Sequence, residues 1–512
     1  MVDDIYRQRN ERSISSDGEF DGNKCNWNSG RVLHNSMRKL LPLLRLLPRE
    51  FLLSFAMRIP FVILAFLLTS SVTKATSYFL SPTGSDANNG TSAGTPWLTP
   101  NHAVNCGDVI LAAPGSYSYS NFNYNFGTVT CASGNNVAWL KCATFDACKI
   151  SITSGEVGIA IAQSYWGVQG WEVDGTSSSG GCFFAYPSYG AIHHVIFAND
   201  IANVCGLSGF VMSNSGAMGV DYFILLGDIA YNAVGNSSEC PSGLNIASGT
   251  QSDSLPGTHI YVAGSFSWAN VNSNPCAGGV PTDGEGLILD SLSTNSYAAQ
   301  VVVDNNIFIY NGGRGLMTFS SPYAPVFLRH NTVYGNNTDT NQSRPYACGE
   351  IVIYSTTYAQ AFNNIAETTA ATACGGYTLD AFLVSASTAP DEVWSNVAYS
   401  ASGSYDGTSG NTGFSYASNP SFGTNPNFFN PTEPGAPSCG SFANVPACMA
   451  AVIQDFMPTN AAAIGFGYQI PSTVSRYDPL YPQWLCTVTN LPSGLVTPGC
   501  VTGSSFSGAQ IH

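Results

Sequence analysis

Positive charge is scarce in most of this chain. Of the 17 Lys and Arg residues among 512, eleven lie before Thr76 and only six lie after it. The same stretch, residues 76–512, holds 25 Asp and Glu, so its formal net charge is -19. A body with this charge repels both nucleic acid and anionic membranes. We therefore expect no nucleic-acid partner, and a polyanionic ligand would need a bridging cation or a local basic patch.

The apolar run near the N-terminus is too short for a comfortable membrane span. It covers ten residues, 59–68, follows Met57 and Arg58, and precedes small residues that end at Ala75. A basic start, an apolar run of about 7 to 15 residues and a small final residue are typical of a secretory signal peptide. We assign residues 57–75 to the signal and residues 1–56 to an upstream extension. The alternative is a signal anchor with a cytoplasmic arm.

Cysteine motifs typical of metal sites are missing. No CxxC pair occurs, and 14 of the 15 Cys lie after the predicted signal, an even number that favours disulfides in an exported chain. Sequence does not determine the connectivity, but four pairs could close loops: Cys142 with Cys148, Cys439 with Cys448, Cys240 with Cys276, and Cys348 with Cys374. We expect a secreted protein, extracellular or periplasmic, with no stable membrane insertion after signal removal.

The chain does contain a repeat. Short apolar runs that begin after Asn, Asp or Ser recur in steps of 28, 37, 41, 25, 33 and 32 residues, at Asp200, Asp228, Ser265, Asn306, Asn331, Asn364 and Asn396. A period of roughly 20 to 50 residues indicates a solenoid, in which each coil buries its apolar face against its neighbours. The 52 Gly and 28 Pro favour turn-rich β structure. We predict a parallel β-helix whose polar column bridges successive turns.

A second column of corners shares this register. Its members precede the apolar residues Phe210, Leu244, Leu287, Leu316, Ile351 and Phe382. Neighbouring strands lie about 4.8 Å apart, so residues one coil apart in sequence become neighbours in space. Glu285 should therefore lie beside Arg314, and Arg329 should form an ion pair with Asp304. For the adjacent His193 and His194 we predict a packing role.

The start of the mature chain resembles a known superfamily. The residues Ser81-Pro82-Thr83-Gly84-Ser85-Asp86, Pro96-Trp97 and Gly107-Asp108-Val109-Ile110 look like the first coil of exported right-handed parallel β-helix proteins of the pectate-lyase-like superfamily. This segment reads as a strand, a Gly/Asn loop, a short amphipathic helix and the first buried strand. The resemblance implies an all-β, single-domain right-handed parallel β-helix over residues 76–400. It also implies an irregular C-terminal cap over residues 401–512. We expect a monomer.

Two insertions point to a candidate site. Residues 271–282 and 336–348 leave the repeat at the same corner, so they can form the walls of a groove. Its floor would hold Asp283, Glu285, Asp290 and Arg314, with Arg344 on a wall. Alternation along the strands places Asp290, Phe319 and Tyr354 in one outward column, where aromatic faces beside a carboxylate suit sugar rings. The alternative is that these outward residues merely lie beneath the loops.

Three functions remain open, and all take a polysaccharide as the partner. The first is a polysaccharide lyase acting on a uronic-acid glycan. For it, the resemblance implies that Asp283, Glu285 and Asp290 hold Ca²⁺ and that Arg314 takes the proton, although bidentate carboxylate binding is chemically easier for arginine. Substrate contacts would come from Asp290, Phe319, Tyr354 and Arg344. The second is a glycoside hydrolase with paired carboxylates roughly 5 to 9 Å apart. The third is a non-catalytic carbohydrate-binding or surface β-helix in which the charges form ladders.

Overall fold

The computed structural model describes residues 75–131, 136–176, 179–235, 241–272, 283–339, 348–369, 379–386, 392–401, 406–409, 421–431, 439–461, 463 and 480–492. The chain divides into two units, residues 1–74 and 75–512, and all described residues lie in the second. Among these residues, no helix combines the length and apolar character needed to cross a membrane.

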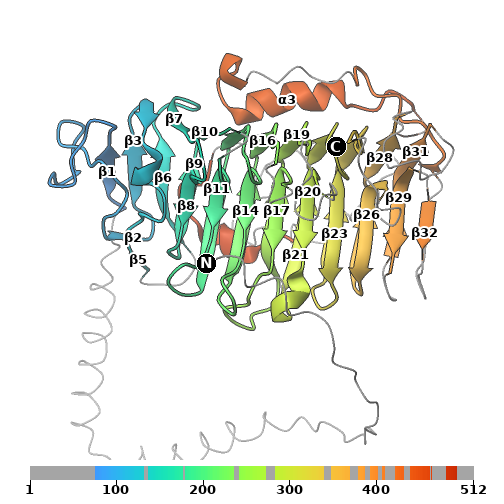
Figure 1. Ribbon diagram of the computed structural model, residues 1–512, viewed down its shortest axis with the longest axis horizontal. Helices are drawn as coiled ribbons and strands as arrows, with labels where there is room; N and C mark the ends of the chain where they lie inside the picture. Colours follow the sequence, from blue (N-terminus) through green and yellow to red (C-terminus); the bar gives the residue numbers. More distant parts are fainter. Residues whose placement is uncertain are drawn as a thin grey trace, which may run out of the picture. The chain divides into compact units, whose positions relative to one another are not determined.

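The second unit is built on three parallel sheets, which we name I, II and III (Figure 1). Sheet I contains β1 (Ser77–Leu80), β3 (Val109–Ala112), β6 (Ala138–Cys142), β9 (Trp166–Gln169), β12 (Ile192–Ala198), β15 (Val220–Leu226), β18 (Thr258–Ala263), β21 (Gln300–Asp304), β24 (Val326–Arg329), β27 (Ala359–Phe362) and β30 (Glu392–Trp394). Sheet II contains β4 (Gly115–Tyr117), β7 (Cys148–Ser151), β10 (Trp171–Asp174), β13 (Ile201–Asn203), β16 (Ile229–Tyr231), β19 (Phe266–Trp268), β22 (Ile307–Ile309), β25 (Thr332–Tyr334), β28 (Ile365–Thr368), β31 (Val397–Ser400) and β33 (Ser421–Phe422). Sheet III contains β8 (Ile159–Ile161), β11 (Phe183–Ala185), β14 (Phe210–Met212), β17 (Leu244–Ala247), β20 (Leu287–Asp290), β23 (Leu316–Ser321), β26 (Gly349–Thr356), β29 (Asp380–Ser385) and β32 (Asp406–Ser409).

Each coil passes from sheet I to sheet II, then to sheet III, and returns to sheet I one strand further along. The predicted right-handed parallel β-helix is therefore confirmed. Its core is one continuous cluster of inward side chains that includes Leu244, Leu287, Leu316 and Ile351. A separate two-stranded sheet, β2 (Val104–Asn105) with β5 (Val129–Thr130), lies in the first coil.

The predicted polar column forms the corner between sheets I and II. The strand residues that follow it pair in the expected register, for example Ile307 with Thr332. Each member binds the backbone of its neighbour: Asn331 Oδ1 accepts from Asn306 N at 3.1 Å, and Asn364 Oδ1 accepts from Asn331 N at 3.0 Å. The residue before each member has a positive φ, as at Asn199, Gly227, Gly264, Asn305, His330, Asn363 and Ser395. This left-handed residue makes the corner tight enough for the side chains to stack.

The first coil differs from the prediction in one element. The short amphipathic helix expected before the first buried strand is not formed, because residues 97–103 contain no helical turn. Asp86 binds this segment instead, since its carboxylate accepts hydrogen bonds from Leu98 N at 3.0 Å and Thr99 N at 2.9 Å. Trp97 stacks between Tyr78 and His102, with ring centroids 4.5 and 3.9 Å away. These contacts hold the backbone in a loop.

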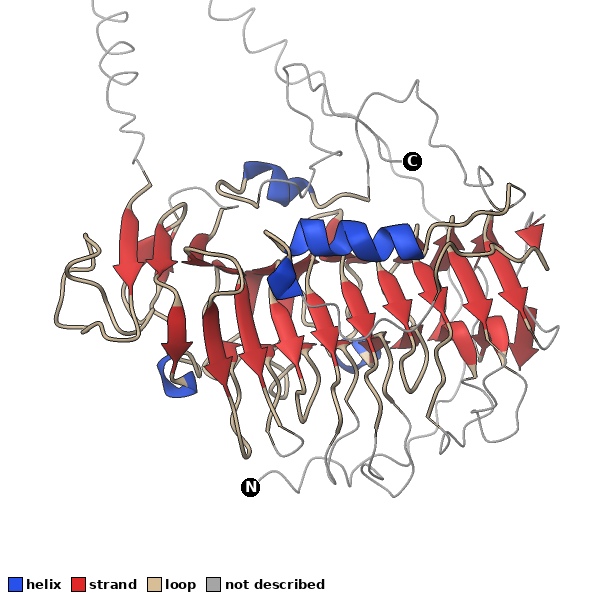
Figure 2. Ribbon diagram, turned by 90° about the horizontal axis from the view of Figure 1, so that it is seen from above, coloured by secondary structure: helices blue, strands red, loops and turns tan. Residues whose placement is uncertain are grey.

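The C-terminal residues cover two of the three sheets. Helix α3 (Val445–Asp455) packs its buried face against sheet II, where it joins Phe266, Trp268 and Ile309 (Figure 2). Residues 480–492, which include the 3-10 helix η7 (Gln483–Thr487), pack with the outward residues of sheet I, such as Trp139 and Ile224. The described part of this region therefore packs along the solenoid, and the helix α3 within it was not predicted.

Disulfides join neighbouring segments of the coils and of the C-terminal region. Described pairs are Cys106 with Cys131, Cys142 with Cys148, Cys182 with Cys205, and Cys439 with Cys448. Two of these, the second and the last, confirm the prediction. Of the other proposed pairs, only Cys348 lies in the described residues, and it is disulfide-bonded.

Candidate functional site

The corner between sheets II and III carries the predicted charged residues. Leu244, Leu287, Leu316 and Ile351 lie in one register across sheet III, so the residues before them stack in the same way. The corner glycine before Leu287 faces a crowded core, because a Cβ on Gly286 would lie 2.5 Å from the Gly315 carbonyl oxygen. Only glycine fits this close approach.

Glu285 and Arg314 meet at this corner, as predicted. Arg314 Nη1 lies 2.7 Å from Glu285 Oε1, and Ser242 Oγ donates to Glu285 Oε2 at 2.7 Å. Glu285 is 0% exposed and Arg314 is 2% exposed, so the pair does not form an open groove floor. This corrects the predicted exposure of both residues. The Arg314 guanidinium is buried and held by Glu285, so it is not placed to reach a substrate proton, which disfavours Arg314 as the base.

The outward column of sheet III is confirmed. Asp290 pairs with Phe319, and Phe319 pairs with Tyr354, in adjacent strands. The two rings stack with centroids 5.2 Å apart and planes 5° apart. One face of each ring therefore lies against the other ring, and Asp290 occupies the neighbouring strand on the other side of Phe319. The partly exposed edges of the two rings, rather than a broad aromatic face, are what a sugar could contact.

Asp290 has an unusual environment for a carboxyl group on an outer face. Burial raises its pKa above the ordinary value, a hydrogen bond from Ser291 opposes the rise, and the negative charge of Glu285 adds to it. Ser291 Oγ donates to Asp290 Oδ1 at 2.7 Å. Ser291 itself has a positive φ of 51°, but Ser248 and Ser320 share this conformation at equivalent strand ends. The conformation therefore belongs to the fold and is no sign of catalytic strain.

The remaining predicted site residues are not brought into one cluster. Asp283 is partly buried at the start of the corner, and Arg344 lies outside the described residues. Within the described ranges, no three His, Cys, Asp or Glu side chains come close enough to share a metal ion, and this holds for Asp283, Glu285 and Asp290. The residues present therefore do not fit the predicted calcium site, and we assign calcium no step.

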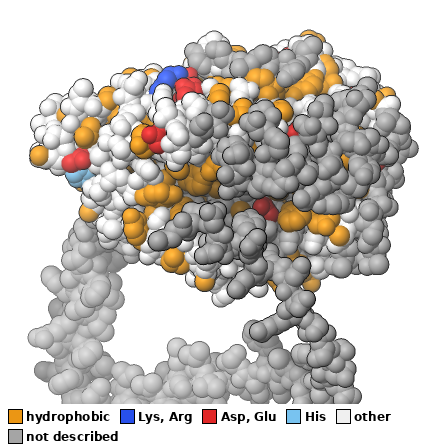
Figure 3. Space-filling view, viewed as in Figure 1, with side chains coloured by type: hydrophobic (Ala, Val, Ile, Leu, Met, Phe, Trp, Pro, Cys, Tyr) orange, Lys and Arg blue, Asp and Glu red, His pale blue; other side chains and the backbone are white. Residues whose placement is uncertain are grey.

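Sheet III presents the face on which a ligand could lie. Sheets I and II are covered by residues 480–492 and by α3, which leaves sheet III without a cover from the described C-terminal residues. Its outward side chains Ile288, Met317, Val352 and Leu383 form their own apolar cluster, with Phe319 and Tyr354 packed against it. Figure 3 shows this side of the molecule, where coloured atoms of apolar side chains gather near the middle.

The corner between sheets III and I holds a charged network that was not predicted. Asp221 accepts hydrogen bonds from His259 Nδ1 at 2.9 Å, from the Tyr297 hydroxyl at 2.8 Å and from Ser252 Oγ at 2.9 Å. His259 Nε2 lies 3.1 Å from the Leu255 carbonyl oxygen, so both ring nitrogens of His259 face oxygen atoms. The network is buried and joins strands β15 and β18 to two loops, which indicates a structural role. Its members are single residues far apart in sequence, so no sequence motif predicts the network.

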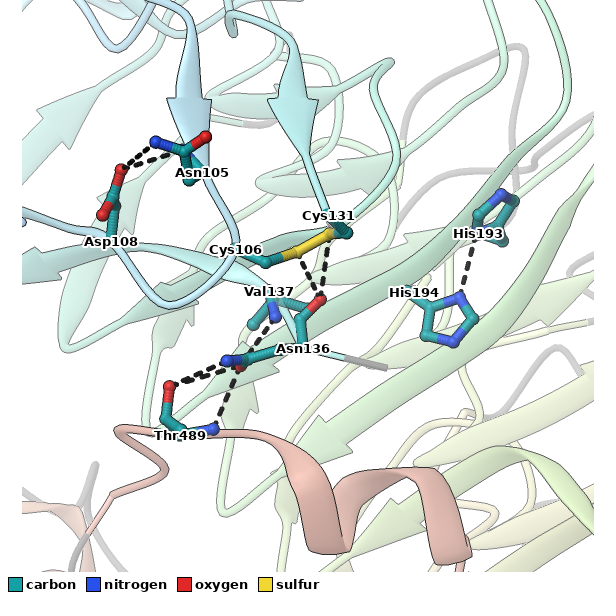
Figure 4. Close-up of a disulfide and its surroundings, with 9 residues drawn as sticks. All are labelled: Asn105, Cys106, Asp108, Cys131, Asn136, Val137, His193, His194 and Thr489. Atoms are coloured by element: carbon teal, nitrogen blue, oxygen red, sulfur yellow. Dashed lines mark hydrogen bonds between the residues drawn. A yellow bond between two sulfur atoms is a disulfide. The ribbon is translucent and has the colours of Figure 1, made fainter. Parts of the chain in front are cut away.

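The adjacent histidines have the predicted packing role. Their Nδ1 atoms lie 2.9 Å apart, so one ring donates and the other accepts (Figure 4). Burial lowers the pKa of His194 to about 3. The His194 ring stacks on Tyr222 at 4.4 Å and meets Trp484 edge-on at 4.6 Å. His194 therefore links the coil to the C-terminal residues that cover sheet I.

Comparisons with known proteins give a consistent but distant picture. No family model matches the sequence, and no curated protein matches it. Among solved structures, the chain is similar to pectate lyase Pel9A, with 17% identity over 71% of this chain and 84% of that chain, and a TM-score of 0.42. It is also similar to the A-module of Azotobacter vinelandii mannuronan C-5 epimerase AlgE4, with 12% identity, 61% and 88% coverage and a TM-score of 0.34. A third is the GH136 lacto-N-biosidase from Eubacterium ramulus, with 11% identity, 63% and 58% coverage and a TM-score of 0.36. Values this low carry no argument about activity, and the fold rests on the parallel strand pairing itself.

Proposed function

We propose that this protein is an exported carbohydrate-active enzyme that binds a polysaccharide on the outer face of sheet III and cleaves it by β-elimination. The observation that carries the proposal is the column of Asp290, Phe319 and Tyr354. In it, a carboxyl group with a raised pKa lies one strand from a stacked, partly exposed aromatic pair. Sugar rings present flat C–H faces that suit such a ring, and their hydroxyls suit a carboxylate.

Asp290 is the residue to which we assign the proton transfer. In β-elimination on a uronic acid residue, the Asp290 carboxylate takes the proton at C5. The C–H electron pair forms the double bond between C4 and C5, the bond from C4 to the linking oxygen breaks, and that oxygen takes a proton from water. A raised pKa makes the ionised Asp290 a stronger base than an ordinary aspartate.

The state of Glu285 favours this reaction over hydrolysis by two carboxylates, which needs a second carboxylate that can activate water or protonate the leaving group. Glu285 is fully buried and is held by Arg314 and Ser242, so it is not available for either role.

A non-catalytic carbohydrate-binding protein is the second candidate, and the state of the arginines favours it. Arg314 pairs with Glu285, and Arg329 Nη2 lies 2.7 Å from Asp304 Oδ2. Both pairs join adjacent coils, as expected for charges that form ladders. The disulfides agree with export in either case, because they persist in oxidising compartments.

The test is a screen of the full chain on pectate, alginate and neutral glycans. Ultraviolet absorbance of an unsaturated product supports β-elimination, and Asp290→Asn should abolish it. Glu392→Gln, an exposed acidic position on sheet I, is the matched control and should leave the rate unchanged. Turnover that survives in Asp290→Asn removes Asp290 from the mechanism. New reducing ends without absorbance show hydrolysis, and binding without turnover shows the second candidate.

A further inference from the structure

Exposed apolar side chains are concentrated on one edge of the solenoid. Among the described residues, eight large hydrophobic side chains are exposed, and three of them, Phe429, Ile453 and Met457, lie in or beside α3. The other five all lie in loops that lead from sheet III to sheet I: Tyr189 at 79%, Met218 at 36%, Leu255 at 62%, Tyr323 at 51% and Tyr358 at 48% exposure. Each of the five occupies a different loop.

These loops are stacked, so the five side chains form a row parallel to the solenoid axis. The loops follow β11, β14, β17, β23 and β26, which are ordered in this way within sheet III. They form the lower edge of the solenoid in Figure 1. From first to last there are five strand steps, which is roughly 24 Å at about 4.8 Å per step. The loop after β20 interrupts the row, because its Tyr297 is buried against Asp221. A row of this length suits an extended chain rather than a compact ligand.

The charge of this edge argues against an anionic ligand. The Lys and Arg residues that the structure describes are Lys141, Lys149, Arg314 and Arg329, and they lie in strands of sheets I and II or at the corner between sheets II and III. The loops of the row carry Asp253 and many Ser, Thr and Asn residues instead. An anionic membrane or a polyuronate would be repelled by such an edge. Neutral hydroxyl groups would not be.

The spacing of the apolar side chains argues against a protein partner. Protein interfaces have a continuous apolar centre, whereas here each loop exposes only one large apolar side chain. A neutral glycan suits such separated apolar side chains, with C–H faces that contact them and hydroxyls that bond to the polar groups between them.

We propose that this edge is a second polysaccharide-binding surface, which holds an uncharged glycan chain along the solenoid axis. This inference rests on the proposed function because both take a polysaccharide as the ligand. The residues of this edge differ from those of the sheet III site. The surface would keep the protein on an insoluble, neutral glycan while sheet III acts on its own substrate.

The experiment measures retention of the full chain on insoluble cellulose, xylan and mannan. The variant Tyr189→Ala/Leu255→Ala/Tyr323→Ala/Tyr358→Ala should lose at least tenfold in affinity for the glycan that the wild type binds. Phe429→Ala/Met457→Ala, which removes exposed apolar side chains beside α3, is the matched control and should bind as the wild type does. Equal thermal melting of all three proteins shows that the loops remain folded.

Three outcomes would overturn the inference: no binding of any neutral glycan by the wild type, full binding by the fourfold variant, or an equal loss in the Phe429→Ala/Met457→Ala control. Asp290→Asn separates this inference from the proposed function. If Asp290→Asn keeps the insoluble glycan bound but loses turnover, both proposals stand. If it keeps turnover while the fourfold variant loses binding, only the sheet III mechanism fails.

Discussion

Two corners of the same coil are built from different chemistry. The corner between sheets I and II repeats one short turn, with a left-handed residue followed by a buried Asn, Asp or Ser. The corner between sheets II and III changes from coil to coil, and places Ser242, Glu285 and Arg314 in one column. The first corner bonds backbone to neutral side chains, whereas the second balances charge against charge.

This difference shows where the fold tolerates variation. Side chains of the uniform corner accept hydrogen bonds from buried backbone N–H groups of the neighbouring coil. A substitution at one member therefore also removes a hydrogen bond of its neighbour. The variable corner accepts insertions, because loops can leave it without disturbing the strands. Functional residues are therefore expected beside the variable corner. Substitutions at the two corners should also change the free energy of unfolding in different ways.

The largest expected effect concerns the acidic members of the uniform corner. Burial raises the pKa of Asp200 to about 8, so the folded protein keeps a proton that the unfolded chain releases near pH 4. The contribution of Asp200 to stability should be highest below about pH 4 and should fall as pH rises to about 8, by up to about 1.4 kcal/mol per pH unit. Asp200→Asn should flatten this slope, because an amide does not titrate.

Urea unfolding at several pH values measures the slope, and Glu392→Gln, at an exposed position of β30, serves as the control. An unchanged slope in Asp200→Asn would show that this carboxyl is ionised in the folded protein. In that case, its hydrogen bonds from Trp171 N at 2.8 Å and Ala198 N at 3.2 Å outweigh burial.

The second prediction breaks the charged column. Arg314→Met should destabilise the protein by about 3 to 5 kcal/mol, because it leaves the buried Glu285 without its partner. The double variant Glu285→Gln/Arg314→Met should recover most of this loss, since no unpaired charge remains. Chemical denaturation measures both. A double variant no more stable than Arg314→Met would mean that the corner depends on the shape of the pair rather than its charge.

The third prediction removes one member of the neutral ladder. Asn331→Ala should cost about 2 to 3 kcal/mol, because the buried Asn306 N and Val303 O each lose a hydrogen-bond partner. Unlike the charged column, no second substitution at a neighbouring member should restore stability. Equal recovery in Asn331→Ala/Asn364→Ala would contradict the contrast between the two corners.

The smallest effect is expected on the outer face of sheet III. Phe319→Leu should weaken glycan binding by about 1 kcal/mol, or roughly fivefold in Kd, because the ring that faces the Asp290 strand is lost. Phe362→Leu is the matched control, since Phe362 stacks on Trp394 at 4.8 Å on sheet I. Isothermal titration with oligosaccharides compares the two, and an equal loss in both would remove the stack from the site.

Much of the architecture could be predicted because the repeat encodes it. Once the Asn column was aligned, the pairing of Glu285 with Arg314 and of Asp290 with Phe319 followed from strand spacing alone. Alignment of the repeats could not predict which corner side chains are exposed to solvent. Whether a corner residue faces solvent depends on what packs over it, and Glu285 proved to be fully buried.

Two features were missed for different reasons. Helix α3 had a readable signal, because Asn444 caps it through Ala447 N and the apolar residues Val445, Cys448, Met449 and Val452 follow a helical spacing. The network of Asp221, His259 and Tyr297 had none, since its members are 38 and 76 residues apart and lie in two strands and a loop. Local patterns predict elements, whereas side-chain contacts between distant segments require coordinates.

The return of the C-terminal residues to the first coils changes how the solenoid should unfold. Thr489 N donates to Asn136 Oδ1 at 3.0 Å, and Trp139 Nε1 donates to the Thr489 carbonyl oxygen at 2.9 Å, across about 350 residues of sequence. A stack of coils linked only to nearest neighbours can fray from either end. Here the C-terminal residues pack on the first coils, so these two parts should melt together, and a nascent chain should acquire its full cooperativity only when the residues around Thr489 have been made.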